Sequence, residues 1–121
     1  MALKVTGYTS GSMKYKIVYQ DAVTQTADVD VLGDGGTVKS LELWNQHSAI
    51  IYFKMKLTSG EYTAGSTEPD VMLRMPATTS KQFDFPDGLS FDQLTFWSND
   101  GATTADTDAP GGTVSATFIC S

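Results

Sequence analysis

Apolar and polar residues alternate with a period of two along most of this chain. The clearest run is Ala49–Leu57, in which Ile51, Phe53 and Met55 share one face and Lys54 lies on the other. Successive side chains of a β-strand point to opposite faces of its sheet, so this alternation predicts strands. No window has the period of 3.6 residues that an amphipathic helix requires.

Eight segments have the alternation or the apolar content of a strand, and turn-forming residues separate them. We therefore predict an all-β fold: an antiparallel β-sandwich, jelly-roll-like, with eight or nine short strands. Residues 1–121 are expected to form a single domain, because neither a linker nor an internal repeat interrupts them. The expected strands are Met13–Tyr19, Ala27–Val31, Val38–Trp44, Ala49–Leu57, Val71–Met75, Lys81–Phe85, Leu89–Trp97 and Val114–Cys120.

Composition and charge exclude several classes of function. Hydrophobic residues make up 40% of the chain and charged residues 18%, which is typical of a globular protein poor in solvated helices. The formal net charge is -6. Nucleic acids and anionic membrane surfaces both attract basic proteins, so we expect neither as a partner.

The single cysteine, Cys120, cannot form an internal disulfide bond. Residues Met1–Thr6 lack the apolar core of a secretory signal peptide. The longest strongly apolar run, Ala49–Phe53, is too short to cross a bilayer. We therefore expect the protein to be made in the cytoplasm of a cell.

Side chains suited to catalysis are scarce. A nucleophile needs a base, and the only histidine is His47, in a polar turn beside Ser48. No basic residue flanks Cys120, which is more typical of a buried small hydrophobe than of a reactive thiol. We predict that the chain is not an enzyme and has no cofactor.

Metal binding has limited support in the sequence. Zinc would need clusters of Cys and His, which are missing. Calcium prefers several oxygen ligands from a flexible loop, and two groups of acidic and amide residues could supply them. Neither group has EF-hand spacing, so no metal ligand is predicted, and calcium binding by the loop from Asn99 to Gly112 is left open. The two groups are Asn99, Asp100, Asp106 and Asp108, and Asp28, Asp30 and Asp34.

Carbohydrate binding is the main rival function. Sugar sites on β-sandwiches use exposed aromatic rings as stacking platforms, and Trp44, Tyr62 and Trp97 are the candidates. Large aromatic residues in a small domain usually lie in the core, and we expect that for each of the three.

A second apolar and aromatic face favours assembly with a partner. Beyond the face that a facing sheet would cover, the strands carry further aromatic and lysine side chains. We predict partner contacts by five of them: Tyr15, Tyr19, Tyr52, Lys54 and Lys56.

From about Gly36 to Ser121 the chain resembles a family of small virion proteins of tailed bacteriophages. The order and spacing of the matching elements carry the resemblance, which covers roughly two-thirds of the chain. After Gly88-Leu89 the family more often continues with aliphatic residues, whereas this chain has Phe96 and Trp97. The elements are Leu41–Asn45, Tyr52–Met55, Gly65–Pro69, Pro76-Ala77, Phe85, Gly88–Phe91 and Ala105–Asp108.

The resemblance implies a structural role without a catalytic or ligand-binding residue. Members of the family are similar to decoration, cement or fibre-base modules, which are typically β-sandwiches repeated on a capsid or tail. We accordingly expect a virion protein, a capsid decoration or cement protein that binds the major capsid protein. A homo-oligomer such as a trimer is expected, and a tail, neck or fibre module or a glycan- or receptor-binding module are the alternatives.

Overall fold

The computed structural model of the protein describes residues 3–10 and 13–121, and all regular structure in those residues is β. No helix occurs in them, which confirms the predicted all-β class. These residues form eight strands, and eight or nine were predicted. The eight strands are β1 (Leu3–Ser10), β2 (Met13–Gln20), β3 (Gly36–Asn45), β4 (Ile51–Lys56), β5 (Val71–Met75), β6 (Thr79–Phe91), β7 (Thr95–Asn99) and β8 (Val114–Cys120).

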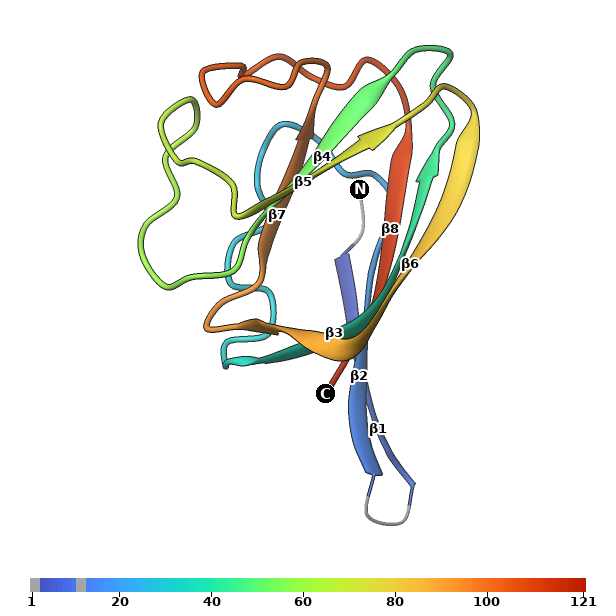
Figure 1. Ribbon diagram of the computed structural model, residues 1–121, viewed down its shortest axis with the longest axis vertical. Helices are drawn as coiled ribbons and strands as arrows, with labels where there is room; N and C mark the ends of the chain where they lie inside the picture. The colour runs from blue at the N-terminus through green and yellow to red at the C-terminus, as the bar shows by residue number, and fades with distance from the viewer. Residues whose placement is uncertain (1–2, 11–12) are drawn as a thin grey trace.

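The strands form two antiparallel sheets that face each other (Figure 1). The larger sheet has the order β1-β2-β8-β3-β6, and the smaller has the order β5-β4-β7. Of the residues of β2, only Lys16–Gln20 pair with β8. The start of β2, Met13–Tyr15, pairs with the end of β1, Tyr8–Ser10, and with no other strand of the described residues. The end of β1 and the start of β2 therefore project below the rest of the molecule (Figure 1). We call β1 and β2 together the arm, and the remainder of the protein the body.

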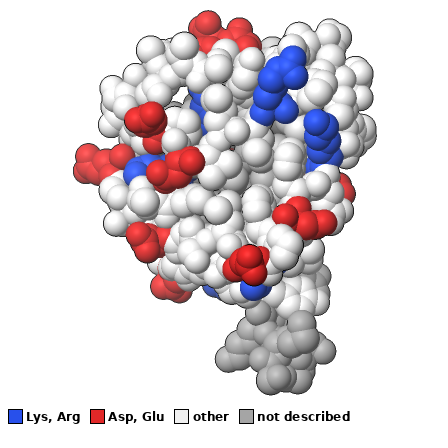
Figure 2. Space-filling view, in the orientation of Figure 1, with Lys and Arg blue, Asp and Glu red and all other residues white. Residues whose placement is uncertain are grey.

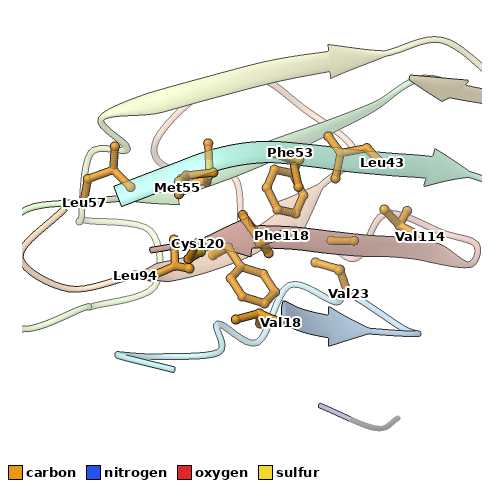
Figure 3. Packing of buried hydrophobic residues seen from close by; sticks show 14 of the residues in the cluster. Val18, Val23, Leu43, Phe53, Met55, Leu57, Leu94, Val114, Phe118 and Cys120 are labelled. Atoms are coloured by element: carbon orange, nitrogen blue, oxygen red, sulfur yellow. The ribbon is translucent and has the colours of Figure 1, made fainter. Parts of the chain in front are cut away.

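Apolar side chains from the facing sides of the two sheets make the core (Figure 3). Phe53 of β4 lies 5.8 Å from Phe96 of β7 and 6.0 Å from Phe118 of β8, measured between ring centroids. Each of these rings is fully buried. Complete burial of one such side chain contributes about 1.5–3 kcal/mol to the stability of a fold. Because Phe53 and Phe96 belong to the smaller sheet and Phe118 to the larger, these contacts hold the two sheets together.

Two buried amides hold the loops at the ends of the strands. Asn45 donates to the carbonyl oxygens of Ala49 and Pro76, each at 2.9 Å, and accepts the N–H of His47 at 3.0 Å. Gln20 donates to Asp28 Oδ2 at 3.0 Å and so ties the end of β2 to the segment that follows it. Because buried polar groups must be hydrogen-bonded, these side chains specify the paths of both loops.

The segment between β2 and β3 differs from its prediction. Ala27–Val31 was expected to be a strand, but only Asp28 forms a β-bridge, with Phe96 of β7. Asp30 has a φ of 48°, which breaks the extended conformation, and Val29 is 51% exposed. The segment crosses from the large sheet to the open side of β7, where Thr24 O accepts the N–H of Ser98 and Val31 N–H donates to Leu94 O.

Two other strands also differ from expectation. Separate strands were expected at Lys81–Phe85 and Leu89–Trp97, but β6 runs through Pro86–Gly88 to Phe91 as an edge strand. The end of the second expected strand, from Thr95, belongs to β7. Proline has no N–H to donate, and an edge strand tolerates this because its open side has no neighbouring strand to bond. Strand β1 was not predicted at all, although Leu3–Tyr8 alternates weakly.

Candidate assembly surface

Strand β1 is an open edge of the larger sheet. Among the residues that the structure describes, β2 is its only partner, and the side chains of residues 3–7 are all exposed. Leu3 and Val5, which are paired with Gln20 and Val18, are 39% and 45% exposed. Their partners are buried beneath the smaller sheet, so β1 lies beyond the region that this sheet covers. An edge strand presents unpaired N–H and C=O groups that can pair with another chain.

The other edges of the two sheets are better protected. The segment around Asp28 follows the open side of β7. Strand β6 is interrupted at Pro86, where its pairing with β3 shifts register between Val38 and Ser40, so only its first part, Thr79–Phe85, is a regular open edge. Strand β5 has only 5 residues. Shortness, proline and bulges are the devices that keep edges from pairing, and β1 has only the charge of Lys4.

Apolar side chains continue on the outer face of the same sheet edge. Ile17 of β2 lies directly opposite Ile119 of β8, and Tyr19 lies opposite Thr117. Ile119 and Tyr19 are each 39% exposed. We call Ile17, Tyr19 and Ile119 the outer stripe. Directly opposed β-branched and aromatic residues form a continuous apolar surface on a sheet.

The structure separates the five side chains predicted to contact a partner into two groups. Tyr15 and Tyr19 project from the outer face of the larger sheet, with Ile17 between them. Tyr52 and Lys56 belong to β4, in the smaller sheet, and are half-buried. The two groups lie on opposite sides of the molecule and cannot form one contact surface.

Lys54 is not available as a contact residue, and that prediction is wrong. Its side chain is 1% exposed, and its Nζ donates to Asn99 Oδ1 and to the carbonyl oxygen of Thr103, each at 2.9 Å. Burial lowers the pKa of Lys54, and the negative charges of Asp106 and Asp100 oppose that effect. The alternation placed Lys54 on the outer face correctly, but the loop after β7 folds back over that face.

Three carboxylates meet in the loop that Lys54 holds. Potential ligand oxygens of Asp100, Asp106 and Asp108 lie within 4.8 Å of one another. Desolvation, a hydrogen bond with Asp106 and the charges of its two neighbours raise the pKa of Asp100. Asn99, which the calcium interpretation would also use, is buried and already bonded to Lys54 and to the carbonyl of Asp108. Asp106 Oδ1 also accepts the N–H of Asp108 at 2.8 Å. Hydrogen bonds within the protein are therefore enough to explain the conformation of this loop.

The aromatic residues considered for sugar binding differ in exposure. Trp97 is 4% exposed and packs against Tyr62 with ring centroids 4.7 Å apart, beneath the loops that cover the smaller sheet. Trp44 was expected in the core but is 50% exposed. It projects from the outer face of β3, opposite Ser80 and Ser115. Two small neighbours leave the indole ring uncovered.

Neither residue considered for nucleophilic chemistry has a catalytic arrangement. Burial raises the pKa of the Cys120 thiol to about 11, which keeps it protonated and unreactive at neutral pH. The side chain of His47 packs against Gly112, where a Cβ atom would collide with it, and also lies close to Gly111. Its backbone carbonyl accepts the N–H of Thr78, so His47 has a structural position between two loops.

Charge is divided unequally between the arm and the body. Residues 1–20 contain Lys4, Lys14 and Lys16 and no acidic residue, a formal charge of +3. The remaining chain has five basic and all 14 acidic side chains, a formal charge of −9. Acidic side chains are spread around the visible face of the body (Figure 2). The arm therefore favours an acidic partner.

None of the described segments forms a helix with the length and apolar character needed to cross a membrane. Comparison with protein-family models, curated proteins and solved structures found no significant match. The resemblance to bacteriophage virion proteins consequently stays a prediction.

Proposed function

We propose that the protein is a structural component of a virion, a capsid decoration or cement protein that binds the major capsid protein through the arm. The observation that carries this proposal is the unprotected edge of β1 next to the exposed outer stripe. Backbone pairing at such an edge supplies affinity, and adjacent apolar side chains supply specificity. Repetition on a symmetric particle multiplies weak contacts, so each copy needs only a modest affinity.

The order of the strands supports a jelly-roll form of the sandwich. In a jelly roll of eight strands, the first, eighth, third and sixth form one sheet, and the second, seventh, fourth and fifth form the other. Counting β2 as the first strand and the segment at Asp28 as a reduced second strand reproduces this order. Strand β1 is then an addition to the fold, at the edge of the first sheet. Jelly rolls are common in viral capsid proteins, an analogy of fold that supports the proposal without establishing it.

The test of location is quantitative mass spectrometry of purified particles from the source, with copy number measured against the major capsid protein. We expect a ratio near one, or a simple fraction set by capsid symmetry. A handful of copies per particle would assign the protein to the tail, neck or fibre. Absence from the particle would overturn the structural role.

The test of the surface is binding of the purified protein to particles that lack it. We expect Tyr19→Ser combined with Ile119→Thr to weaken binding roughly tenfold, because both remove exposed apolar area from the outer stripe. Met72→Thr is the matched control, since Met72 is 43% exposed on β5 of the other sheet. Equal loss of binding in both variants would contradict the assignment of the surface.

Glycan binding is the second candidate, because Trp44 is half-exposed. A sugar ring could stack on its indole between the small side chains of Ser80 and Ser115. Titration with a panel of sugars, followed by tryptophan fluorescence, tests this function. A saturable change that Trp44→Ala abolishes would establish it, and a change retained in that variant would exclude Trp44 as the platform.

A further inference from the structure

We propose that a second copy of this chain occupies the open edge of β1, through its own strand β6, so that copies join head to tail into a continuous sheet. This inference rests on the proposed function and divides the arm between two partners: the second copy pairs with the backbone edge of β1, and the outer stripe stays available to the capsid protein. It adds a second interaction surface, the open side of β6, that the binding of a capsid protein does not require.

Charge complementarity favours a second copy. The arm carries +3 and the body −9, so the arm of one molecule is attracted to the body of another. On β6 the exposed charged side chains are Asp84, Asp87 and Lys81. Lys81 lies opposite Leu43, on the other face of the strand from Asp84. Lys4 projects from the outer face of β1, since it lies opposite Tyr19, and Asp84 projects from the same face of β6, opposite Ser40. In a joined sheet these two charges lie on one face.

The direction of the strands also permits this contact. Each neighbouring pair in the five-stranded sheet is antiparallel, so its first and last strands, β1 and β6, run in the same direction. A second copy in the same orientation therefore places its β6 alongside β1 as a parallel neighbour. The segment before Pro86, from Thr79 to Phe85, is about as long as β1 and has no strand on its open side within the described residues.

Pairing of β1 with β1 across a two-fold axis is less favourable. It would bring two arms of charge +3 together, with no acidic side chain in residues 1–20 of either copy. Like charges placed opposite each other destabilise a sheet. The head-to-tail contact is heterologous, and such contacts close into a ring when the rotation between copies allows it.

Salt dependence of self-association tests the role of charge. Sedimentation of the purified chain over a range of concentrations should show oligomers at low salt, with roughly tenfold weaker association at high salt because the charges are screened. Lys4→Glu combined with Lys16→Glu should weaken association at low salt by at least roughly tenfold. Lys56→Glu combined with Arg74→Glu changes the net charge equally on the smaller sheet, away from both proposed surfaces, and should have little effect.

Disulfide trapping tests the surfaces. A chain with Thr6→Cys is mixed with chains carrying Ser80→Cys, Gln82→Cys or Asp84→Cys, all on exposed outer-face positions. We expect a cross-linked dimer with at least one of these three, and none with Met72→Cys, on the other sheet. The native Cys120 is buried and should not interfere.

Three results would overturn the inference. Cross-linking of Thr6→Cys mainly with itself would show a two-fold contact, and cross-linking with Met72→Cys would move the acceptor to β5. A chain that stays monomeric at every concentration, alone and on particles, would remove the second copy as the occupant. If that monomer still binds particles through the outer stripe, the proposed function stands while this inference fails.

Discussion

At the scale of single residues, burial was decided by loops rather than by strand pattern. Lys54 and Trp44 both lie on outer faces of their sheets, yet Lys54 is 1% exposed and Trp44 is 50% exposed. The loop after β7 covers Lys54 and supplies two oxygen acceptors for its ammonium group. Nothing comparable covers Trp44. Since a buried charge must be hydrogen-bonded, the lysine and the loop depend on each other.

Replacing Lys54 by Met tests this dependence. The substitution keeps the apolar stem but leaves the oxygens of Asn99 and Thr103 without their donor. We expect a loss of about 2–3 kcal/mol in the free energy of unfolding, measured with denaturant, because bonds to charged groups are among the stronger ones. Lys56→Met is the control and should cost less than about 0.5 kcal/mol, since Lys56 donates to the exposed Thr58 hydroxyl and acts on Asp70 only through its charge, at the surface. Equal losses would mean that Lys54 does not anchor the loop.

A pH-dependent contribution is expected from Asp70. Its carboxylate accepts the N–H groups of Leu57 and Thr58 at 2.7 and 3.2 Å. Desolvation alone would raise the pKa of Asp70, but these bonds, the Thr58 hydroxyl and the charge of Lys56 lower it overall. A carboxyl group with a lowered pKa stabilises the fold above its unfolded pKa of about 3.9 and loses this contribution as pH falls.

Asp70→Asn should therefore destabilise the protein by roughly 1 kcal/mol at neutral pH, a modest value because the side chain is exposed. The difference from the unmodified chain should shrink as pH falls below about 4. Denaturant unfolding across this range measures it, with Glu68→Gln as the exposed control. A difference that does not vary with pH would contradict the assignment of the effect to the charged carboxylate.

At the scale of elements, β6 shows how a turn sequence can be drawn into a strand. Pro86, Asp87 and Gly88 predict a turn, but Thr37–Val38 and Ser40–Asn45 of β3 pair with β6 on either side of them. Gly88 has a φ of 79°, and the register shifts between Val38 and Ser40 at the same level of the sheet. The turn residues thus produce an irregularity at an edge, where proline and positive φ are tolerated.

The two glycines of the edge strands should respond differently to alanine. A Cβ atom on Gly88 would collide with Thr37, and its φ is strained for any other residue, whereas Gly7 of β1 has open space around it. Gly88→Ala should cost about 1–3 kcal/mol in thermal or denaturant unfolding. Gly7→Ala should be neutral or stabilising by a few tenths of a kcal/mol. A neutral Gly88→Ala would show that this part of β6 is not held against β3.

At the scale of the whole molecule, cohesion is concentrated in the body. The rings of Phe53, Phe96 and Phe118 join the two sheets, while every side chain from Leu3 to Gly7 is exposed. Strand β1 therefore contributes none of its residues 3–7 to the core, although Val18 of β2 is fully buried there. The arm is also the basic part of an acidic protein. Low local stability and complementary charge are properties expected of a surface that is completed by a partner.

Hydrogen exchange should separate the arm from the body. We expect the amides of β1 in the isolated chain to exchange many-fold faster than those of β3 and β8, which have a strand on each side. On particles, or in the self-associated state, the exchange of β1 should slow while that of β3 stays unchanged. If β1 were equally protected in the dilute monomer, its edge would not be open.

The alternation of side chains determined the fold class and most strands of this protein, because a period of two is a local property that each segment carries by itself. The excess of acidic over basic side chains was also readable from the sequence. The tertiary structure alone decided the loss of the strand at Ala27–Val31, the burial of Lys54, the exposure of Trp44 and the open edge of β1. Each depends on which distant strand or loop lies alongside, and such pairings between segments far apart in the chain leave no local periodicity to read.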